Sequence, residues 1–158
     1  TDWWKLKRPA PLLGEHNNEV LGEVATLQDK SIDNTGSEQI GSGTKYPFDG
    51  LRVISMSVIY AGPYGTMFLG DMGAEVIKVE SPAGDYIREM TWPIVEGVSL
   101  LHLHTHRGKR SITLNLKTEQ GVALYKELVA RADVVIQALR QTPGGWTAAR
   151  SIFCNASV

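Results

Sequence analysis

The feature that most constrains the fold is an apolar run followed closely by a glycine-rich segment. The run LRVISMSVIY, residues 51–60, is rich in β-branched side chains and follows a turn-like Asp-Gly pair, so it predicts a buried strand. The segment GPYGTMFLGDMG, residues 62–73, then has the pattern of a helix that begins through Gly62 and Pro63. Gly73 is suited to end this helix, because glycine readily takes the left-handed conformation of a C-terminal cap.

The following residues repeat the alternation of strands and helices. The run AEVIKVE (74–80) predicts a second strand, ended by the turn SPAGD, and RSITLNL (110–116) predicts a third. Thr118 is placed to cap a helix with apolar residues at helical spacing, and ADVVIQAL (132–139) predicts a fourth strand. Residues 86–106 show no regular pattern. We therefore expect an α/β protein with a Rossmann-like, mainly parallel sheet, in which ligands bind beyond the carboxyl ends of the strands.

The amino-terminal part of the chain has a different character. Residues 1–27 begin with an extended, proline-bearing stretch and continue as a predicted short helix that Asn17 or Asn18 can cap. Residues 28–48 are rich in Gly, Ser, Thr, Asn and charged residues and predict a linker. This division leaves 49–158 as the α/β domain. The apolar stripe of the predicted helix consists of Val20, Leu21, Val24 and Leu27.

The composition limits the partners that we expect. Sixteen basic and seventeen acidic residues among 158 give a formal net charge of -1, which gives no reason to expect a nucleic acid or a membrane surface as a partner. No run approaches the roughly 18 apolar residues of a membrane span, and the amino terminus lacks the apolar core of a signal peptide. The single cysteine, Cys154, fits a reducing compartment. The expected location is therefore cytoplasmic.

A dinucleotide site is one alternative for the strand ends. Glu80 ends the second predicted strand about where a Rossmann fold places the acid that binds the ribose. The glycines argue against this alternative, because those after the first strand fall at 62, 65, 70 and 73 and not in the G-x-G-x-x-G spacing that lets the backbone approach a pyrophosphate.

Three ordered motifs point to a specific family. AGPYGTMFLGDMGAEVIKVESPAGD is followed by RGKRSITLNLKTEQG and then by ARADVVIQALR. Together they resemble the amino-terminal domain of family III CoA-transferases, which include formyl-CoA and carnitine-type CoA-transferases and, by the same fold, α-methylacyl-CoA racemase. The resemblance covers residues 49 to about 140 and implies part of that domain, with coenzyme A (CoA) or acyl-CoA as a substrate and no tightly bound cofactor.

The resemblance also implies a set of CoA-contacting positions across the strand ends. Only Lys117 and Arg140 among them carry a positive charge suited to a phosphate. A solvated surface charge is the alternative for either residue. The implied positions are Tyr60, Ala61, Ser81, Leu114, Asn115, Leu116, Lys117, Ala138, Leu139 and Arg140.

Two further groups of residues are candidates for other sites. The cluster RGKR (107–110) is expected to be a solvated loop before a strand and at most a secondary phosphate contact. His102, His104 and His106 alternate, so on an extended segment they would share one side and could bind zinc. An exposed polar edge is the alternative, and because no second ligand cluster lies nearby and the resemblance implies no metal, no metal site is predicted.

The sequence departs from the family pattern in places that matter for function. Ala138 and Leu139 stand where the family usually has asparagine and phenylalanine, and Ser81 stands where some members have arginine. The family nucleophile is an aspartate further along, with no match here, so no catalytic residue is assigned. We expect Asp71, Asp85 and Asp133 to be capping or surface carboxylates.

The amino-terminal segment adds an expectation about organisation. RPAPLLGEHNNEVLGEV resembles the carboxyl-terminal tail of the same family, so the chain is interpreted as spanning the junction of two tandem modules, with the short helix packed on the α/β unit. The partners would be a CoA thioester and a second copy or the remainder of a tandem transferase. Three functions stay open: the CoA-binding portion of a transferase, a non-catalytic fragment or interaction module, and part of an acyl-CoA racemase.

Overall fold

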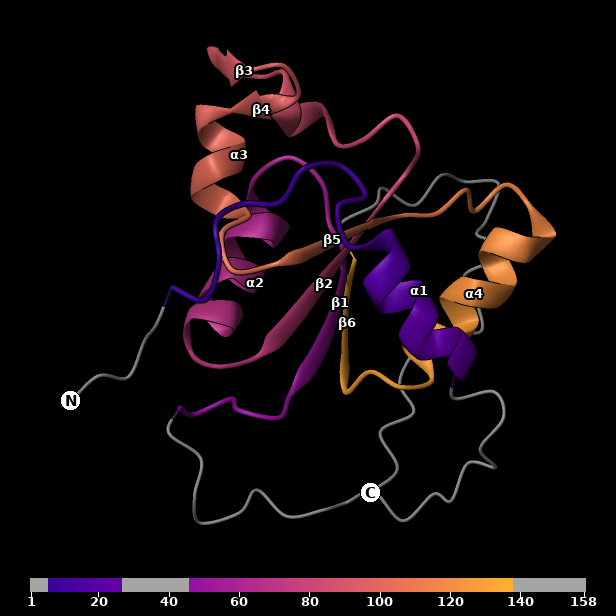
Figure 1. The fold of residues 1–158 in the computed structure, drawn as a ribbon. Helices are drawn as coiled ribbons and strands as arrows, with labels where there is room; N and C mark the ends of the chain where they lie inside the picture. Colours follow the sequence, from indigo (N-terminus) through magenta and orange to yellow (C-terminus); the bar gives the residue numbers. More distant parts are fainter. Residues whose placement is uncertain (1–5, 27–45, 138–158) are drawn as a thin grey trace, which may run out of the picture.

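A four-stranded parallel sheet forms the centre of the protein (Figure 1). The computed structural model describes residues 6–26 and 46–137. The strand order is β5-β2-β1-β6, which confirms the expected α/β, Rossmann-like architecture. The strands are β1 (Arg52–Met56), β2 (Glu75–Glu80), β5 (Arg110–Thr113) and β6 (Val134–Gln137).

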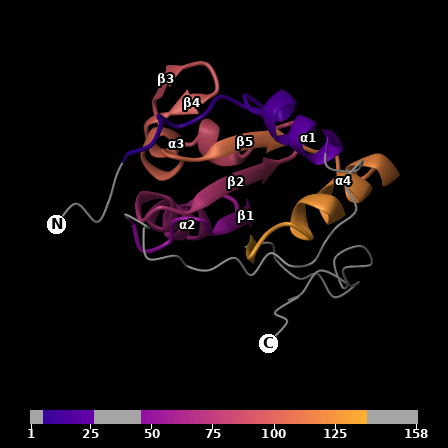
Figure 2. The ribbon, with the colours of Figure 1, turned by 60° about the horizontal axis from the view of Figure 1, so that its bottom comes forward.

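The helices that connect these strands lie on opposite faces of the sheet (Figure 2). Helix α2 (Ala61–Asp71) connects β1 to β2 on one face, and α4 (Glu119–Val129) connects β5 to β6 on the other. The chain therefore moves outward from β1 through β2 to β5 and then returns to the opposite side of β1. This reversal puts a topological switch point between the carboxyl ends of β1 and β6, where α/β sheets bind ligands.

The ends of both helices follow the sequence signals. Gly73 has φ +114° just after α2, and a Cβ atom there would lie 2.7 Å from a carboxylate oxygen of Asp49 and 2.8 Å from the Cβ of Tyr46. Glycine is therefore required at this position for both conformation and space. Thr118 caps α4 as predicted, because its Oγ1 accepts a hydrogen bond from the amide of Gly121 at 3.1 Å.

The segment between β2 and β5 is more regular than the sequence indicates. Residues 86–106, expected to be irregular, form four short elements, whose two to six residues are too few to show a period. The side chain of Ser99 caps the last of them by accepting a hydrogen bond from the amide of His102. The elements are η1 (Tyr86–Arg88), β3 (Pro93–Val95), β4 (Val98–Ser99) and α3 (Leu100–Thr105).

Helix α1 (Asn17–Thr26) packs against α4 and β5, as expected for the short amino-terminal helix (Figures 1 and 2). Val20 and Val24 are buried in the same core cluster as Ile112 of β5. Asn17 does not act as the predicted cap. Its side-chain amide instead donates to the Thr113 hydroxyl and accepts from the Thr113 backbone amide, at 2.8 Å each. These bonds pair polar groups at the outer edge of β5.

Two strands end earlier than the apolar runs predict. β1 ends at Met56 rather than at residue 60, and β5 ends at Thr113 rather than at residue 116. Residues 57–60 and 114–116 therefore lie in loops at the carboxyl edge of the sheet. None of the helices in residues 6–26 and 46–137 is long and apolar enough to cross a membrane.

Candidate functional site

The loop between β1 and α2, residues 57–60, is the most unusual part of the carboxyl edge. Ile59 has φ +66°, and it is the only residue other than glycine with positive φ in the described part of the chain. A β-branched residue pays a steric penalty in this conformation, because its Cβ approaches the carbonyl oxygen. Its side chain is also 42% exposed, so burial of the isoleucine does not explain the conformation. Strain of this kind is concentrated at binding sites.

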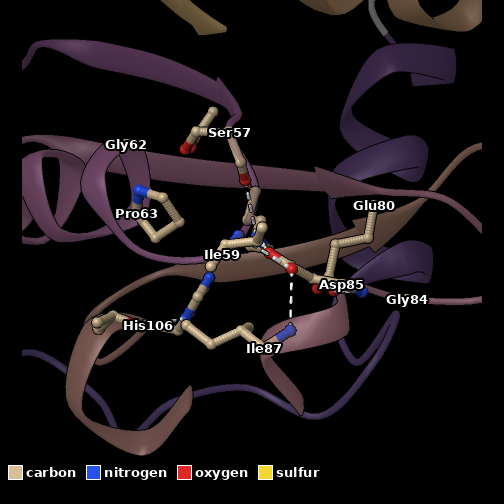
Figure 3. Close-up of polar contacts among 12 residues, drawn as sticks. Ser57, Ile59, Gly62, Pro63, Glu80, Gly84, Asp85, Ile87 and His106 are labelled. Carbon is tan, nitrogen blue, oxygen red and sulfur yellow. Dashed lines mark hydrogen bonds and ion pairs between the residues drawn. The ribbon is translucent and has the colours of Figure 1, made fainter. Parts of the chain in front are cut away.

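Asp85, which follows β2, holds this loop in place (Figure 3). Its Oδ1 accepts hydrogen bonds from the amides of Ile59 at 3.2 Å and Ile87 at 3.1 Å. Its Oδ2 forms an ion pair with Lys78 at 2.5 Å, and the Lys78 ammonium also donates to the carbonyl of Ser57 at 3.0 Å. The side chains of Lys78 and Asp85 are both 1% exposed. We call this pair the loop clamp.

The loop clamp continues into a second buried ion pair. Arg88 donates to both carboxylate oxygens of Glu80, at 3.0 and 2.6 Å. Glu80 also accepts from the Asp85 amide and from the Ser111 hydroxyl. Burial raises the pKa of both carboxyl groups, but the cations beside them, Arg88 for Glu80 and Lys78 for Asp85, hold each pKa below its ordinary value. Both carboxylates are therefore charged near neutral pH.

Two buried histidines lie beside this network, and their geometry contradicts the extended arrangement. Because residues 100–105 are helical, His102 and His106 lie one turn apart with rings stacked at 4.6 Å, whereas His104 contacts Tyr64 of α2. Burial, reinforced by the Arg88 charge, lowers the pKa of His102 to about 4. Burial and nearby lysine charges also lower the pKa of His106. No group of three or more potential metal ligands occurs among the described residues.

The RGKR cluster is not the solvated loop that was expected. Arg107 forms an ion pair with Asp71 at 2.7 Å, and Lys109, with 0% of its surface exposed, donates to the carbonyl of Pro63 at 2.7 Å. Arg110 is buried as well. Burial, followed by the charge of Lys78, lowers the pKa of Lys109 well below its ordinary value. These cations therefore serve internal contacts. The carboxylates that Arg110 contacts belong to Glu19, Glu23 and Glu75.

An aromatic surface borders the same loop. Tyr60 precedes α2, is 43% exposed and stacks on Tyr64 with ring centroids 5.2 Å apart and 14° between the planes. Tyr64 in turn contacts the edge of Phe68. The ring of Tyr60 is thus supported on one side while much of it stays accessible, which suits stacking against a base.

The structure brings several of the implied CoA positions to one edge. Tyr60 and Ala61 lie in and just after the β1 loop, Ser81 follows β2, and Asn115 and Lys117 follow β5. All five are exposed.

The remaining positions differ in their surroundings. The side chain of Leu114 is buried in the core and Leu116 packs against it, so only their backbones are available at the edge. Ala138, Leu139 and Arg140 lie outside the described residues. The proposed role of Arg140 therefore stays a prediction.

The loop clamp was not found by sequence reasoning. Asp85 does cap η1, as a capping carboxylate would, but it is buried and ion-paired rather than on the surface. A signal was present in the run EVIKVE, because a lysine in the middle of a strand buried on both faces requires a buried partner.

Comparisons with known proteins agree with these features. The model of the family described as CoA-transferase family III matches residues 48–145. The chain belongs to CoA-transferase family III. As a family III chain it is 43% identical over 104 residues to succinyl-CoA:glutarate CoA-transferase of Mus musculus, covering 65% of this chain and 24% of that protein. It is 48% identical over 100 residues to succinate–glutarate CoA-transferase of Agrobacterium fabrum, covering 59% of this chain and 25% of that protein.

Two solved structures are similar to this chain in both sequence and fold. A CAIB/BAIF family protein from Brucella suis is 49% identical, with a TM-score of 0.54 over 60% of this chain and 26% of that one. Rv3272 from Mycobacterium tuberculosis is 40% identical, with a TM-score of 0.57 over 67% of this chain and 30% of that one. This family III chain therefore spans about a quarter of the length of the curated relatives it matches.

Proposed function

We propose that the carboxyl edge of the sheet binds the nucleotide portion of a CoA thioester, as part of a protein that transfers CoA between carboxylic acids. The observation that carries this proposal is the strained, exposed loop at Ile59, which lies at the topological switch point and is held by a buried ion pair. Membership of CoA-transferase family III supports CoA as the ligand.

The residues at the edge have roles that suit this ligand. Tyr60 would stack on the adenine, and Lys117, exposed after β5, would neutralise a phosphate as a mobile point charge. Arg140 would supply a second cation from beyond β6. The cations of the RGKR cluster do not take part, because their contacts are internal.

The transfer chemistry would require residues beyond these 158. An aspartate in another part of the protein would attack the thioester carbonyl, releasing the CoA thiolate and leaving a mixed anhydride. The thiolate would then attack the aspartyl carbonyl, which releases the donor carboxylate and leaves an aspartyl-CoA thioester. The acceptor carboxylate would attack that thioester in turn, and the thiolate released would attack the acceptor's carbonyl, giving the new acyl-CoA and the free aspartate. Several similar proteins are named for succinyl-CoA or succinate with glutarate or malate, which supports short dicarboxylic acyl groups as a first choice of substrate. A second copy or another subunit is the proposed partner, and relatives in Chloroflexus aurantiacus are named as α and β subunits.

Calorimetric titration of the purified chain with CoA tests the binding proposal. We expect binding of CoA and of adenosine 3′,5′-bisphosphate but not of pantetheine, because the proposed contacts are to the nucleotide. Tyr60→Leu should weaken binding by about tenfold, as loss of one stacked base contact does. Phe68→Leu, at the far end of the same ring series, is the matched control and should bind as the unmodified chain does.

Incubation with succinyl-CoA and glutarate, followed by mass spectrometry, tests the chemistry. We expect no glutaryl-CoA from this chain alone. Turnover by the chain alone would contradict the assignment of the nucleophile to another part of the protein, and absence of any nucleotide binding would favour a non-catalytic interaction module.

A further inference from the structure

We propose that the loop clamp, Lys78 with Asp85, positions the β1–α2 loop for the CoA nucleotide, and that neither side chain touches the ligand. This inference rests on the proposed function for its ligand, but the conformation that the clamp enforces can be tested without any ligand. Both side chains are buried, so their effect on a bound molecule must pass through the loop.

The clamp holds the loop at two points that are two residues apart. Lys78 donates to the carbonyl of Ser57, and Asp85 accepts from the amide of Ile59. Since the two side chains are joined at 2.5 Å, the distance between the two anchor points on the loop is fixed by one ion pair. The buried Ser57 hydroxyl adds a third contact, to Ser55 at 2.8 Å.

The conformation of Ile59 requires such an anchor. Without the acceptor at Asp85, an isoleucine would relax to a negative φ, because the left-handed conformation is unfavourable for its branched side chain. A change in φ at residue 59 would redirect the next residue, Tyr60, whose ring is the proposed stacking surface. The clamp therefore affects ligand binding by fixing the orientation of the Tyr60 ring.

The surroundings orient Asp85 for this role. Its own amide donates to Glu80 at 3.1 Å, and Glu80 is fixed by Arg88 and Ser111. Its Oδ1 is shared between Ile59 and Ile87, so the loop and η1 are held by one oxygen. A buried ion pair adds little net stability compared with apolar packing, whereas it does fix a single geometry, which is the property that a positioned loop needs.

Amide hydrogen exchange tests the clamp in the unmodified chain. We expect the Ile59 amide to be protected although its side chain is exposed, because the amide is bound to Asp85. In Asp85→Asn the amide group would orient its oxygen towards Lys78, and the Ile59 amide should then exchange at least about tenfold faster while the β2 amides stay protected. Asp71→Asn, which breaks a partly buried ion pair away from the loop, is the control and should leave Ile59 protected.

A rescue experiment separates positioning from general stability. Asp85→Asn should weaken CoA binding by about tenfold, because the loop loses its charge-assisted bond at Ile59 and binding must then supply that ordering free energy. Adding Ile59→Gly should restore affinity to within about threefold of the unmodified chain, because glycine takes positive φ without an anchor. A merely structural defect at Asp85 would not be repaired by glycine at residue 59.

The outcomes distinguish the two proposals. An unprotected Ile59 amide in the unmodified chain, or an Asp85→Asn variant that folds and keeps both protection and affinity, would overturn the clamp. Failure of the glycine rescue in a folded double variant would overturn it as well. If protection of the Ile59 amide depends on Asp85 but the chain binds no CoA, the role of the clamp in positioning the loop is supported and CoA is rejected as the ligand.

Discussion

The two faces of the sheet are formed by alternate residues of the same strands, yet they differ in chemistry. On the face covered by α1 and α4, Ile54, Ile77 and Ile112 pack in a continuous apolar core. On the face covered by α2, the apolar cluster is confined to the amino-terminal part of the strands, and Lys78 and Glu80 occupy their carboxyl-terminal part. We infer that the apolar face mainly stabilises the fold, whereas the charged face mainly fixes the position of the β1–α2 loop.

The charged half of the second face lies directly under the proposed ligand site. Buried charges cost desolvation that their pairing does no more than offset, so they are a poor means of stabilising a fold. They are an effective means of fixing a backbone, because each donor and acceptor has a direction. Their position beneath the strained loop at Ile59 is consistent with that use.

The largest effect is expected from breaking the charged face. Arg88→Met should lower the free energy of unfolding by about 3–5 kcal/mol, because it leaves the buried carboxylate of Glu80 without its main partner. Urea unfolding followed by circular dichroism measures this change. Lys117→Met, on an exposed side chain, should change stability by less than about 0.5 kcal/mol. A loss below about 1 kcal/mol for Arg88→Met would contradict the assigned importance of the pair.

A cavity in the apolar face should cost somewhat less and leave the loop alone. Ile112→Ala should lower the free energy of unfolding by about 3 kcal/mol through lost burial and a partly collapsed cavity. Exchange of the Ile59 amide should stay slow in this variant under native conditions, and rapid local exchange there would show that the two faces are not separable. Leu12→Ala, on an exposed side chain, serves as the control.

Acid should destabilise the charged face through its histidines. His102 has a pKa of about 4 in the folded protein, compared with 6.5 in the unfolded chain. Between these pH values unfolding takes up a proton, so the free energy of unfolding decreases as the pH is lowered. Between pH 7 and pH 5 His102 should account for a loss of about 2 kcal/mol, and His106 should act in the same direction. The carboxylates add to the loss at lower pH, since their pKa values are lowered.

Urea unfolding at several pH values measures this dependence. His102→Gln should flatten the slope between pH 7 and pH 5 relative to the unmodified chain. Asn18→Ala, at an exposed residue without an ionisable side chain, is the control and should leave the slope as it is. An unchanged slope in His102→Gln would show that this histidine is not the group that titrates on unfolding.

The smallest effect is expected at the edge of β5. Asn17→Ala should lower stability by about 1 kcal/mol, because the Thr113 amide and hydroxyl lose their partner at the outer edge of the strand. Asn18→Ala, one residue away and exposed, should have no measurable effect. Equal effects of the two substitutions in thermal unfolding would argue that Asn17 acts only as a helix residue.

The apolar face could be read from the sequence, and the charged face could not. The strand AEVIKVE and the helix that follows Thr118 each have their sequence signals within a few residues. These elements, and the parallel direction of the strands, could therefore be predicted from local rules. The pairings of Lys78 with Asp85 and of Arg88 with Glu80 depend on how the chain turns after β2, which no local period predicts. The pairing of Asn17 with Thr113 depends on how two distant parts of the chain meet.

The site shows the same limit. The positions at strand ends, such as Tyr60 and Ser81, could be placed from the motifs, because loops after parallel strands share one edge. The strained φ of Ile59 could not be anticipated, since isoleucine is among the residues least suited to that conformation. The burial of Lys109 and Arg110 could not be anticipated either, because short basic runs usually face solvent.

Mapping the ligand on the chain by amide NMR tests the central claim most directly. On addition of CoA, the account predicts shift changes at residues 57–61, at Ser81 and at residues 114–117, all at the carboxyl edge. The amides of α1 and of the central turns of α4, on the apolar face, should not move. Changes confined to α1 and α4, or no changes at saturating CoA, would contradict a nucleotide site at this edge of the sheet.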